Sequence, residues 1–560
     1  MTETRVCKNC QQDFTIEQED FDFYKKIDVP APTLCPDCRF QRRLAWFKAF
    51  RLYKRRCDLC LKEKISMYRP DAPYTVYCTD CWWSDKWDSA AFAQEYDFSR
   101  PFFEQFDDLL HKAPLLGLVI DKASIPTSPF NNYIGHAKNT YLTYYCDNNQ
   151  DVAYGFFLSG NKSALDCVSE WESEQSYDNI NGYKNFQVNG SFSNVHDSLD
   201  CSFVKDGQNL QHCFGSASIY SKKYVFFNEQ LTKEEYEKRR AEIDLGSYAT
   251  YQKMKIAAEQ TWKNTIPRPY YDYFSENCTG NYAFHSKNSK ECYQSGYCED
   301  SKFVFLMKNP TTKDSYDYMD WGENALRVYE CVTVGGNATD VRFSHDCGYG
   351  LSDVEYTNLA FSGNSNLFGC ASVRNKQYCI LNKQYSKEEY QALRAKIVAQ
   401  MKQNGEYGEF FPMKLSPHDY NDTFAQLVFP ITKEQALAQG LTWMESPSSE
   451  YQVTMNAGDL PDHIRDAQDS VLKEVIKCAE CSRGYRITPD ELGFLRQRNF
   501  PLPRRCPFCR IEEKVKKWVK QSVRLVDCTC DKCGAAFRTP YRKEDAAVVY
   551  CKKCYQAEFI

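Results

Sequence analysis

The middle of the chain, residues 131–401, repeats a short pattern of polar and apolar positions. A polar corner of Ser, Asn, Gln or Lys precedes a short alternating apolar piece, as in Lys162-Ser-Ala-Leu and His196-Asp-Ser-Leu. The strand-like pieces recur at steps of roughly 10 to 14 residues, a spacing typical of coils in a parallel β-solenoid. We therefore expect a mainly β protein, with a parallel β-solenoid (β-helix) of two strands to a coil of about 22 residues. Alternate residues of each strand are expected to point inward.

The repeat region occurs twice, and one constant offset relates the two copies. Thr232-Lys-Glu-Glu-Tyr matches Ser386-Lys-Glu-Glu-Tyr, and in each a Ser or Thr is followed three positions later by Glu. This capping-box pattern predicts that a helix begins at the end of each solenoid unit and caps it.

Two basic stretches, residues 39–56 and 510–525, carry apolar residues at helical spacing. Both predict an amphipathic helix with a cationic face. Such a face can be solvated surface on a helix that packs its rings on a neighbouring module, or it can contact nucleic acid or an acidic protein. The candidate contact residues are Arg39, Arg42, Arg43, Arg55, Arg56, Arg510, Lys514, Lys516, Lys517 and Lys520.

Sixteen of the 28 cysteines form C-x2-C pairs near the two ends of the chain. The interval from Cys10 to Cys35 recurs from Cys481 to Cys506, and the shorter interval from Cys60 to Cys78 recurs from Cys533 to Cys551. Two such pairs suit one tetrahedral zinc ion, and four thiolates leave no open position for catalysis, so we expect four structural Zn2+ sites. Their ligands are Cys7, Cys10, Cys35, Cys38; Cys57, Cys60, Cys78, Cys81; Cys478, Cys481, Cys506, Cys509; and Cys530, Cys533, Cys551, Cys554.

The remaining cysteines form no such pairs. Cys528 stands just before Cys530, and the aligned spacing favours Cys530 as the ligand with Cys528 as a competitor. Eleven further cysteines lie in the repeat region, where we expect them to be buried as small hydrophobes, with a metal or redox role as the alternative.

Composition and length place the chain in a broad class. Met1 to Phe14 lacks the apolar run of a signal peptide, and the apolar stretch from Pro114 to Ile120 is too short to cross a bilayer. Paired cysteines without a secretion signal favour the cytoplasm, and no membrane. A chain of 560 residues implies several domains. We predict zinc modules at 1–88, an aromatic connector at 89–130, solenoid units at 131–266 and 267–401, a strap at 402–470, and zinc modules at 471–560.

The sequence indicates no catalytic residue and no organic cofactor. His212 beside Cys213, and His345 with Cys347, are the only suggestive histidine–cysteine contacts, and a nucleophile would need a geometry that sequence does not show. Parallel β-solenoids can carry paired carboxylates that cleave polysaccharides. Three aspartates recur beside the central cysteines and keep this enzyme alternative open: Asp166, Asp200 and Asp346.

The terminal modules resemble zinc ribbons or treble clefs of the form C-x2-C…P-x-P…C-P-x-C-R, as in Cys7–Arg39 and Cys478–Arg510. The whole arrangement is similar to a family of large uncharacterised proteins of uncultured bacteria, with zinc ribbons at both ends and an Asn/Cys/Tyr-rich middle ending as Asn382–Tyr390 does here. The resemblance implies no function.

These observations favour a non-enzymatic zinc-binding scaffold or adaptor. The basic helices make nucleic acid, RNA or a single strand, the expected partner, because aromatic-rich surfaces suit unpaired bases. A protein-assembly platform, with an oligomeric state that the sequence leaves open, is the second hypothesis. A carbohydrate-active solenoid is the third.

Overall fold

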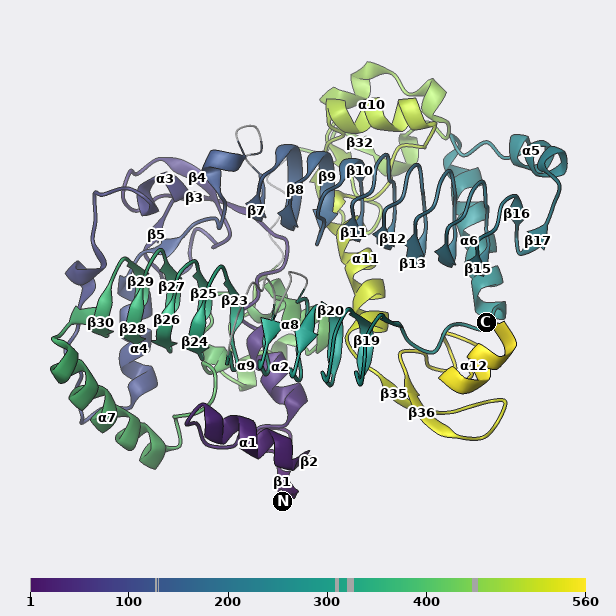
Figure 1. The fold of residues 1–560 in the computed structure, drawn as a ribbon. Coiled ribbons are helices and arrows are strands. Elements are labelled where there is room, and N and C mark those ends of the chain that lie inside the picture. The colour runs from purple at the N-terminus through teal and green to yellow at the C-terminus, as the bar shows by residue number, and fades with distance from the viewer. Residues whose placement is uncertain are drawn as a thin grey trace. The chain divides into compact units, whose positions relative to one another are not determined.

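The computed structural model describes residues 2–125, 128, 130–307, 312–319, 327–445 and 452–559. The chain forms two compact units (Figure 1). Unit 1 contains Met1–Leu118, Tyr270–Met444 and Ser522–Arg524, and unit 2 contains Val119–Pro269, Glu445–Gln521 and Leu525–Ile560. Each unit thus joins one half of the repeat region to cysteine-rich segments that are distant in sequence. The domain boundaries given above stay a prediction.

Unit 2 contains the first parallel ladder of strands, which lie side by side in Figure 1. Lys138 pairs with Gln150 and Gln150 with Lys162, so the chain returns to the same position after 12 residues. The step is 13 residues where Phe192 pairs with Lys205. The expected length of about 22 residues is therefore wrong, because each step of about 12 residues is a full return of the ladder and not half of one. The strands are β7 Asn132–Gly135, β8 Lys138–Asp147, β9 Gln150–Phe156, β10 Lys162–Leu165, β11 Val168–Trp171, β12 Ile180–Tyr183, β13 Phe192–His196, β14 Lys205–Gln208 and β15 Ala217–Tyr220.

The backbone of the first ladder turns at every third residue. Tyr145, Asn148, Asp151, Tyr154 and Phe157 all have left-handed backbones, with φ between 53° and 56°. The residue after each of these corners is buried, so inward positions recur with period three and not with the expected period two. The left-handed conformation costs roughly 1–2 kcal/mol for a residue with a Cβ, and Asn and Asp tolerate it best. The polar corners seen in the sequence are therefore turning residues.

Unit 1 contains the second ladder, in which many steps are 13 residues long. Val332 pairs with His345, His345 with Asn358, and Asn358 with Ala371. The additional residue is absorbed at a doubled left-handed corner, such as Gly336 followed by Asn337. The strands are β18 Asp272–Tyr273, β19 Gly280–Phe284, β20 Cys292–Gly296, β21 Cys298–Glu299, β22 Thr312–Lys313, β23 Val332–Gly335, β24 Thr339–Arg342, β25 His345–Gly348, β26 Ser352–Glu355, β27 Asn358–Phe361, β28 Ser365–Phe368, β29 Ala371–Arg374, β30 Gln377–Ile380 and β31 Lys383–Gln384.

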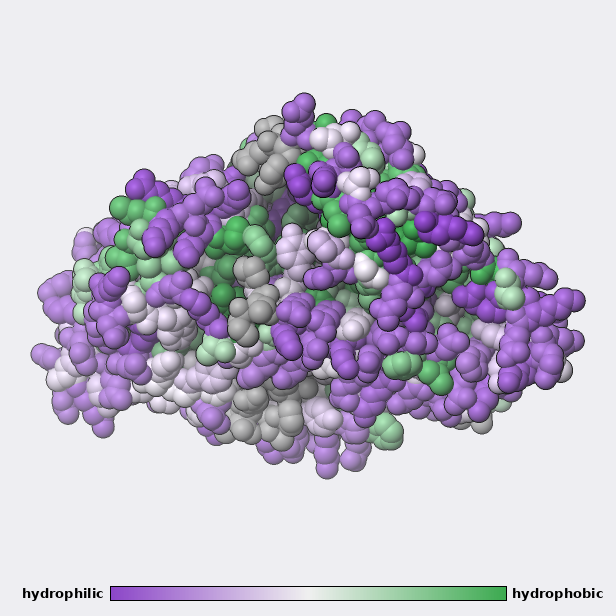
Figure 2. Space-filling view, turned by 90° about the horizontal axis from the view of Figure 1, so that it is seen from above, coloured by the Kyte–Doolittle hydropathy of each residue, from purple (hydrophilic) through white to green (hydrophobic). Residues whose placement is uncertain are grey.

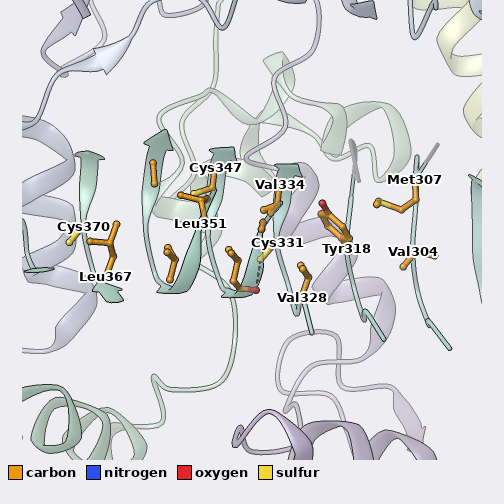
Figure 3. Close-up of a cluster of buried hydrophobic side chains, with 14 of the residues drawn as sticks. Val304, Met307, Tyr318, Val328, Cys331, Val334, Cys347, Leu351, Leu367 and Cys370 are labelled. Carbon is orange, nitrogen blue, oxygen red and sulfur yellow. Dashed lines mark hydrogen bonds between the residues drawn. The ribbon is translucent and has the colours of Figure 1, made fainter. Parts of the chain in front are cut away.

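Small apolar side chains fill the interior of both ladders. In the second ladder Cys331, Val334, Cys347 and Leu351 belong to one buried cluster, which extends along successive strands (Figure 3). The Cys331 Sγ donates to the carbonyl of Val341, 3.4 Å away. Ten of the eleven central cysteines are buried, which confirms their expected place in the core, and Cys278 is half-buried.

Buried amides connect successive steps of the first ladder. The backbone N–H of Asn161 donates to the Oδ1 of Asn149 at 3.0 Å, and the N–H of Ser173 donates to the Oδ1 of Asn161 at 2.9 Å. The Nδ2 of Asn161 donates to the carbonyl of Glu170. Each inward Asn or Ser in this column therefore satisfies backbone groups that the tight corners leave unpaired.

Helices follow both ladders. The predicted capping boxes are confirmed at Thr232 and Ser386, which begin α5 Lys233–Ala241 and α7 Lys387–Asn404. The hairpin of β16 Val225–Phe226 and β17 Glu229–Gln230 precedes α5, and α6 Tyr248–Asn264 follows it. Among the described residues, no helix has both the length and the apolar character needed to span a membrane. In the view of Figure 2, hydrophilic residues cover most of the surface and hydrophobic ones form separate small groups.

Four cysteine modules complete the two units. Module 1 contains β1 Glu3–Val6, β2 Asp13–Ile16, α1 Gln18–Lys26 and α2 Pro36–Leu44, and module 2 contains β3 Tyr53–Arg56, β4 Glu63–Ser66, β5 Val76–Tyr77 and α3 Thr79–Trp82. Module 3 contains β33 Ile476–Lys477, β34 Gly484–Tyr485, α10 Pro489–Arg498 and α11 Pro507–Ser522. Module 4 contains β35 Val526–Thr529, β36 Ala536–Thr539 and α12 Lys552–Phe559. Other short elements are α4 Phe102–Lys112, β6 Leu115–Leu116, α8 Phe424–Val428, α9 Lys433–Ala438 and β32 Met455–Asn456.

The first predicted basic helix is shorter than its pattern indicated. The helix α2 ends at Leu44, and the end of the stretch forms β3, which pairs with β4. Trp46, Phe47 and Phe50 between them are all buried, so this apolar run has no exposed helical face. The second basic helix, α11, extends to Ser522 as a single element.

Candidate metal centres

The first cysteine pair of every module lies on a tight hairpin turn. In module 1 the Cys7 N–H donates to the carbonyl of Gln12 at 2.9 Å, and the chain turns through the left-handed residue Gln11. Leu61, Ser482 and Gly534 take the same left-handed position in the other three modules. This turn directs the two sulfurs of a C-x2-C pair toward one point.

The second cysteine pair of every module lies at the start of a helix. The helices α2, α3, α11 and α12 each begin one residue after the third cysteine of their group. The backbone N–H of this third cysteine donates to the sulfur of the first, at 3.3 Å from Cys35 to Cys7 and at 3.2 Å in the other three modules. Helix N-termini favour negative charge, so this position suits thiolates.

The sixteen predicted sulfurs come together in the four predicted groups of four. Within each group all sulfur atoms lie within 4.8 Å of one another. Contacts between the second and third cysteines measure 3.7 Å for Cys10–Cys35, 3.6 Å for Cys481–Cys506 and 3.8 Å for Cys533–Cys551. A disulfide has its sulfurs about 2.05 Å apart, so these thiols are not bonded to each other. Each group could hold one metal ion.

Hydrogen bonds lower the pKa of the first cysteine in the first, second and fourth groups. Burial raises the pKa of Cys7, but hydrogen bonds that backbone N–H groups donate to its sulfur outweigh the effect of burial and lower the pKa to about 6. The same opposition lowers the pKa of Cys57 to about 7 and that of Cys530 to about 6. Metal binding requires deprotonated thiols, so these hydrogen bonds prepare the groups for a cation.

Cys528 lies outside the fourth group, and Cys530 belongs to it. This agrees with the prediction from the aligned spacing. Its side chain is half-buried against Tyr541, Ala546 and Val549, the small apolar core of module 4. Its Sγ donates to the carbonyl of Thr529.

The basic residues of α2 are engaged with carboxylates elsewhere in unit 1. The Arg39 Nε lies 2.9 Å from Asp317 Oδ2, and Arg43 Nη1 lies 3.0 Å from the other oxygen of Asp317. All three side chains are almost fully buried. Arg42 pairs with Glu409 at 3.3 Å. These side chains hold module 1 against the ladder within unit 1.

The remaining candidates of unit 1 lie in module 2. Arg55 is buried and donates to the carbonyls of Arg69, Ala72 and Tyr74. Arg56 is exposed, and its Nε donates to the carbonyl of Leu61 at 3.1 Å.

The basic residues of α11 repeat this arrangement within unit 2. Arg510 is buried between Asp166 and Glu491, and Lys514 lies 2.8 Å from Asp178 on the first ladder. The three others are more exposed and pair with acidic residues of unit 2: Lys516 with Glu512, Lys517 with Glu259 and Glu513, and Lys520 with Glu544 and Asp545.

The same two positions of each duplicated module thus contact the ladder. Arg39 and Arg43 correspond to Arg510 and Lys514 at the constant offset that relates module 1 to module 3. These cations could be predicted from the sequence, but their partners Asp317, Asp166 and Asp178 were not. Both helices place two cations on a side that is otherwise apolar. This repeated pattern could have indicated that buried carboxylates pair with them.

Neither suggestive histidine faces the cysteine beside it in sequence. The His212 Nδ1 lies 2.9 Å from Asp200, and the Cys213 Sγ donates to backbone carbonyls. The His345 ring contacts Asn358 and the carbonyl of Trp46, at 2.8 and 2.9 Å. These histidines have structural hydrogen bonds and do not activate a thiol.

Comparison with known proteins identifies no relative: no family model, no curated protein and no solved structure matches this chain. The resemblance to zinc ribbons therefore rests on the four cysteine groups alone.

Proposed function

We propose that this protein is a non-enzymatic, zinc-stabilised scaffold, built from two parallel β-solenoids that are each held by two treble-clef-like zinc modules. The observation that carries the proposal is the spacing of the sulfur atoms. Four sulfurs at about 2.3 Å from one zinc ion stand about 3.8 Å apart in a tetrahedron. The sulfur–sulfur contacts of 3.6–3.9 Å match this edge length.

The spacing of corners and of parallel pairings in the two ladders supports a solenoid. A corner at every third residue and a parallel return after 12 residues correspond to four short sides per coil. The second ladder keeps this plan, with doubled corners at its longer steps. A solenoid offers long, regular outer faces, which suits binding and assembly more directly than it suits catalysis.

Zinc binding and solenoid packing are coupled in this proposal. Cys35 and Cys38 lie at the start of α2, and Arg39 of the same helix forms an ion pair with Asp317. Zinc at Cys506 and Cys509 likewise fixes the start of α11, which carries Arg510 to Asp166. Structural zinc contributes roughly 10–16 kcal/mol in small modules, so its removal should release these helices from the ladders.

Nucleic-acid binding through the basic helices stays a prediction. Arg39, Arg43, Arg510 and Lys514 are buried in ion pairs, which leaves the exposed residues Arg56, Lys516 and Lys520 as the available contacts. Filter binding against salt tests the idea, since a complex held by contacts to phosphates should weaken as salt rises. Binding that salt does not affect, or no binding at low salt, would remove it. Protein assembly and carbohydrate cleavage stay predictions as well, tested by light scattering after size exclusion and by release of reducing sugar.

Metal analysis tests the main proposal. Mass spectrometry of the intact native protein should find four zinc ions per chain. Cys530→Ser should retain three, whereas the matched variant Cys528→Ser should retain four, because only Cys530 belongs to a group. Purified protein that takes up zinc at fewer than four sites, or equal loss in both variants, would refute the proposal.

A further inference from the structure

The four cysteine groups differ in how well their sulfurs are protected. In the second group Cys57, Cys78 and Cys81 are all buried. In the fourth group only Cys530 is buried, Cys533 is exposed, and Cys551 and Cys554 are half-buried. Since oxidation of a thiolate follows its exposure, the four groups should not be equally reactive.

The short contact between the second and third cysteines shows the difference most clearly. In the first and third groups this contact joins an exposed sulfur to a buried one, Cys10 to Cys35 and Cys481 to Cys506. In the fourth group it joins exposed Cys533 to half-buried Cys551, 3.8 Å away. Both members of this pair are therefore open to a reagent in solution.

Modules 3 and 4 also differ in the helix that follows the third cysteine. Module 3 continues from its third cysteine into the long helix α11, whose Ile511, Val515 and Trp518 are buried. Module 4 continues into the shorter helix α12, which buries Tyr555. A helix with this single anchor covers less of its metal group and can shift more easily.

We infer that Cys533 and Cys551 are a peroxide-oxidisable pair, and that the fourth group is the site from which zinc is released first. This inference rests on the proposed zinc-binding function. The Cys533 thiolate attacks hydrogen peroxide, so that an S–O bond forms, the O–O bond breaks and hydroxide leaves. The Cys551 thiolate then attacks the sulfenic sulfur, forming the S–S bond and releasing a second hydroxide. The two thiolates lose two electrons in total, peroxide accepts them, and two protons convert the hydroxides to water.

The product cannot hold zinc as before. The two sulfurs move from 3.8 Å to a bond of about 2.05 Å, and only Cys530 and Cys554 remain as thiolates of the group. Reduction of the disulfide restores four thiolates, so the release is reversible. Cys528 lies on the strand leading to Cys530 and is not part of the reacting pair.

The full-length zinc-loaded protein is titrated with hydrogen peroxide and examined by native mass spectrometry and disulfide mapping. We expect loss of one zinc per chain before any other, a Cys533–Cys551 disulfide in the same chains, and recovery of the fourth zinc with dithiothreitol and zinc. Cys528→Ser should behave in the same way.

Three outcomes would overturn the inference. These are a first disulfide at Cys10–Cys35 or Cys481–Cys506, a first disulfide to Cys528, and simultaneous loss from all groups. A protein that never holds four zinc ions would refute the proposed function itself, whereas ordered release from another group would refute the present inference alone.

Discussion

Replacement of Asn161 tests whether the buried amide column stabilises the first ladder. The side chain is 1 % exposed, its Oδ1 accepts from the N–H of Ser173 at 2.9 Å, and its Nδ2 donates to the carbonyl of Glu170. Asn161→Ala leaves the buried N–H of Ser173 without a partner, whereas the carbonyl of Glu170 keeps the N–H of Ser159 as a donor at 3.3 Å. The unsatisfied N–H costs about 1–3 kcal/mol and the lost second bond to Glu170 about 0.5–1.5 kcal/mol, so we expect the free energy of opening this part of the ladder to fall by about 1.5–4.5 kcal/mol.

Hydrogen exchange read by mass spectrometry measures the opening free energy of each segment separately. A local measurement is needed because the two units need not unfold together. Peptides of β9 to β12 should lose protection, while peptides of unit 1 keep theirs. The matched control is Gln208→Ala, which removes an exposed amide from the same ladder and should change the opening free energy by less than about 0.5 kcal/mol. Equal effects of the two substitutions would show that the buried column is not stabilising.

Three further predictions concern the corners, a buried lysine and the ladder contacts. Asn148 is an exposed left-handed corner with φ 53°, so Asn148→Val should cost about 1–2 kcal/mol and Asn148→Gly almost nothing, measured by urea unfolding. Burial lowers the pKa of Lys205 to about 8, below about 10.4 in the unfolded chain. Its protonation therefore destabilises the fold as pH falls from 10.4 through 8, by about 3 kcal/mol in total. Lys205→Met should remove this pH dependence and be the more stable protein at pH 7, and a variant with an unchanged pH profile would contradict the assignment. Arg510→Met leaves the buried carboxylate of Asp166 uncompensated and should cost about 3–5 kcal/mol in thermal or urea unfolding, whereas Lys516→Met on the exposed side of α11 should cost less than about 1 kcal/mol.

The four cysteine groups could be predicted almost completely because their geometry is local. A C-x2-C turn orients two sulfurs over a few residues, and the duplicated spacing shows which turns belong together. Even the choice of Cys530 over Cys528 followed from alignment with the first half of the chain. The capping boxes at Thr232 and Ser386 succeeded for the same reason, since both partners lie within one helical turn.

The three-residue period of inward positions in the ladders was not predicted, because we expected alternate residues of each strand to point inward. Asn148, Asp151 and Tyr154 take left-handed backbones, which isolated residues with a Cβ avoid. Backbone hydrogen bonds to the neighbouring steps of the ladder stabilise this conformation, so the three-residue period exists only when the steps are paired with one another. A search for apolar residues at every third position would have detected it.

The sequence by itself determined the four cysteine groups, the helix starts and the presence of a duplicated repeat, since each depends on residues close together in the chain. The tertiary structure alone decided the role of the basic helices. Arg39 meets Asp317, and Arg510 meets Asp166, across hundreds of residues. A cation is exposed or buried according to whether a carboxylate reaches it in the folded protein, because an unpaired buried charge is too costly. Only the fold brings the two together.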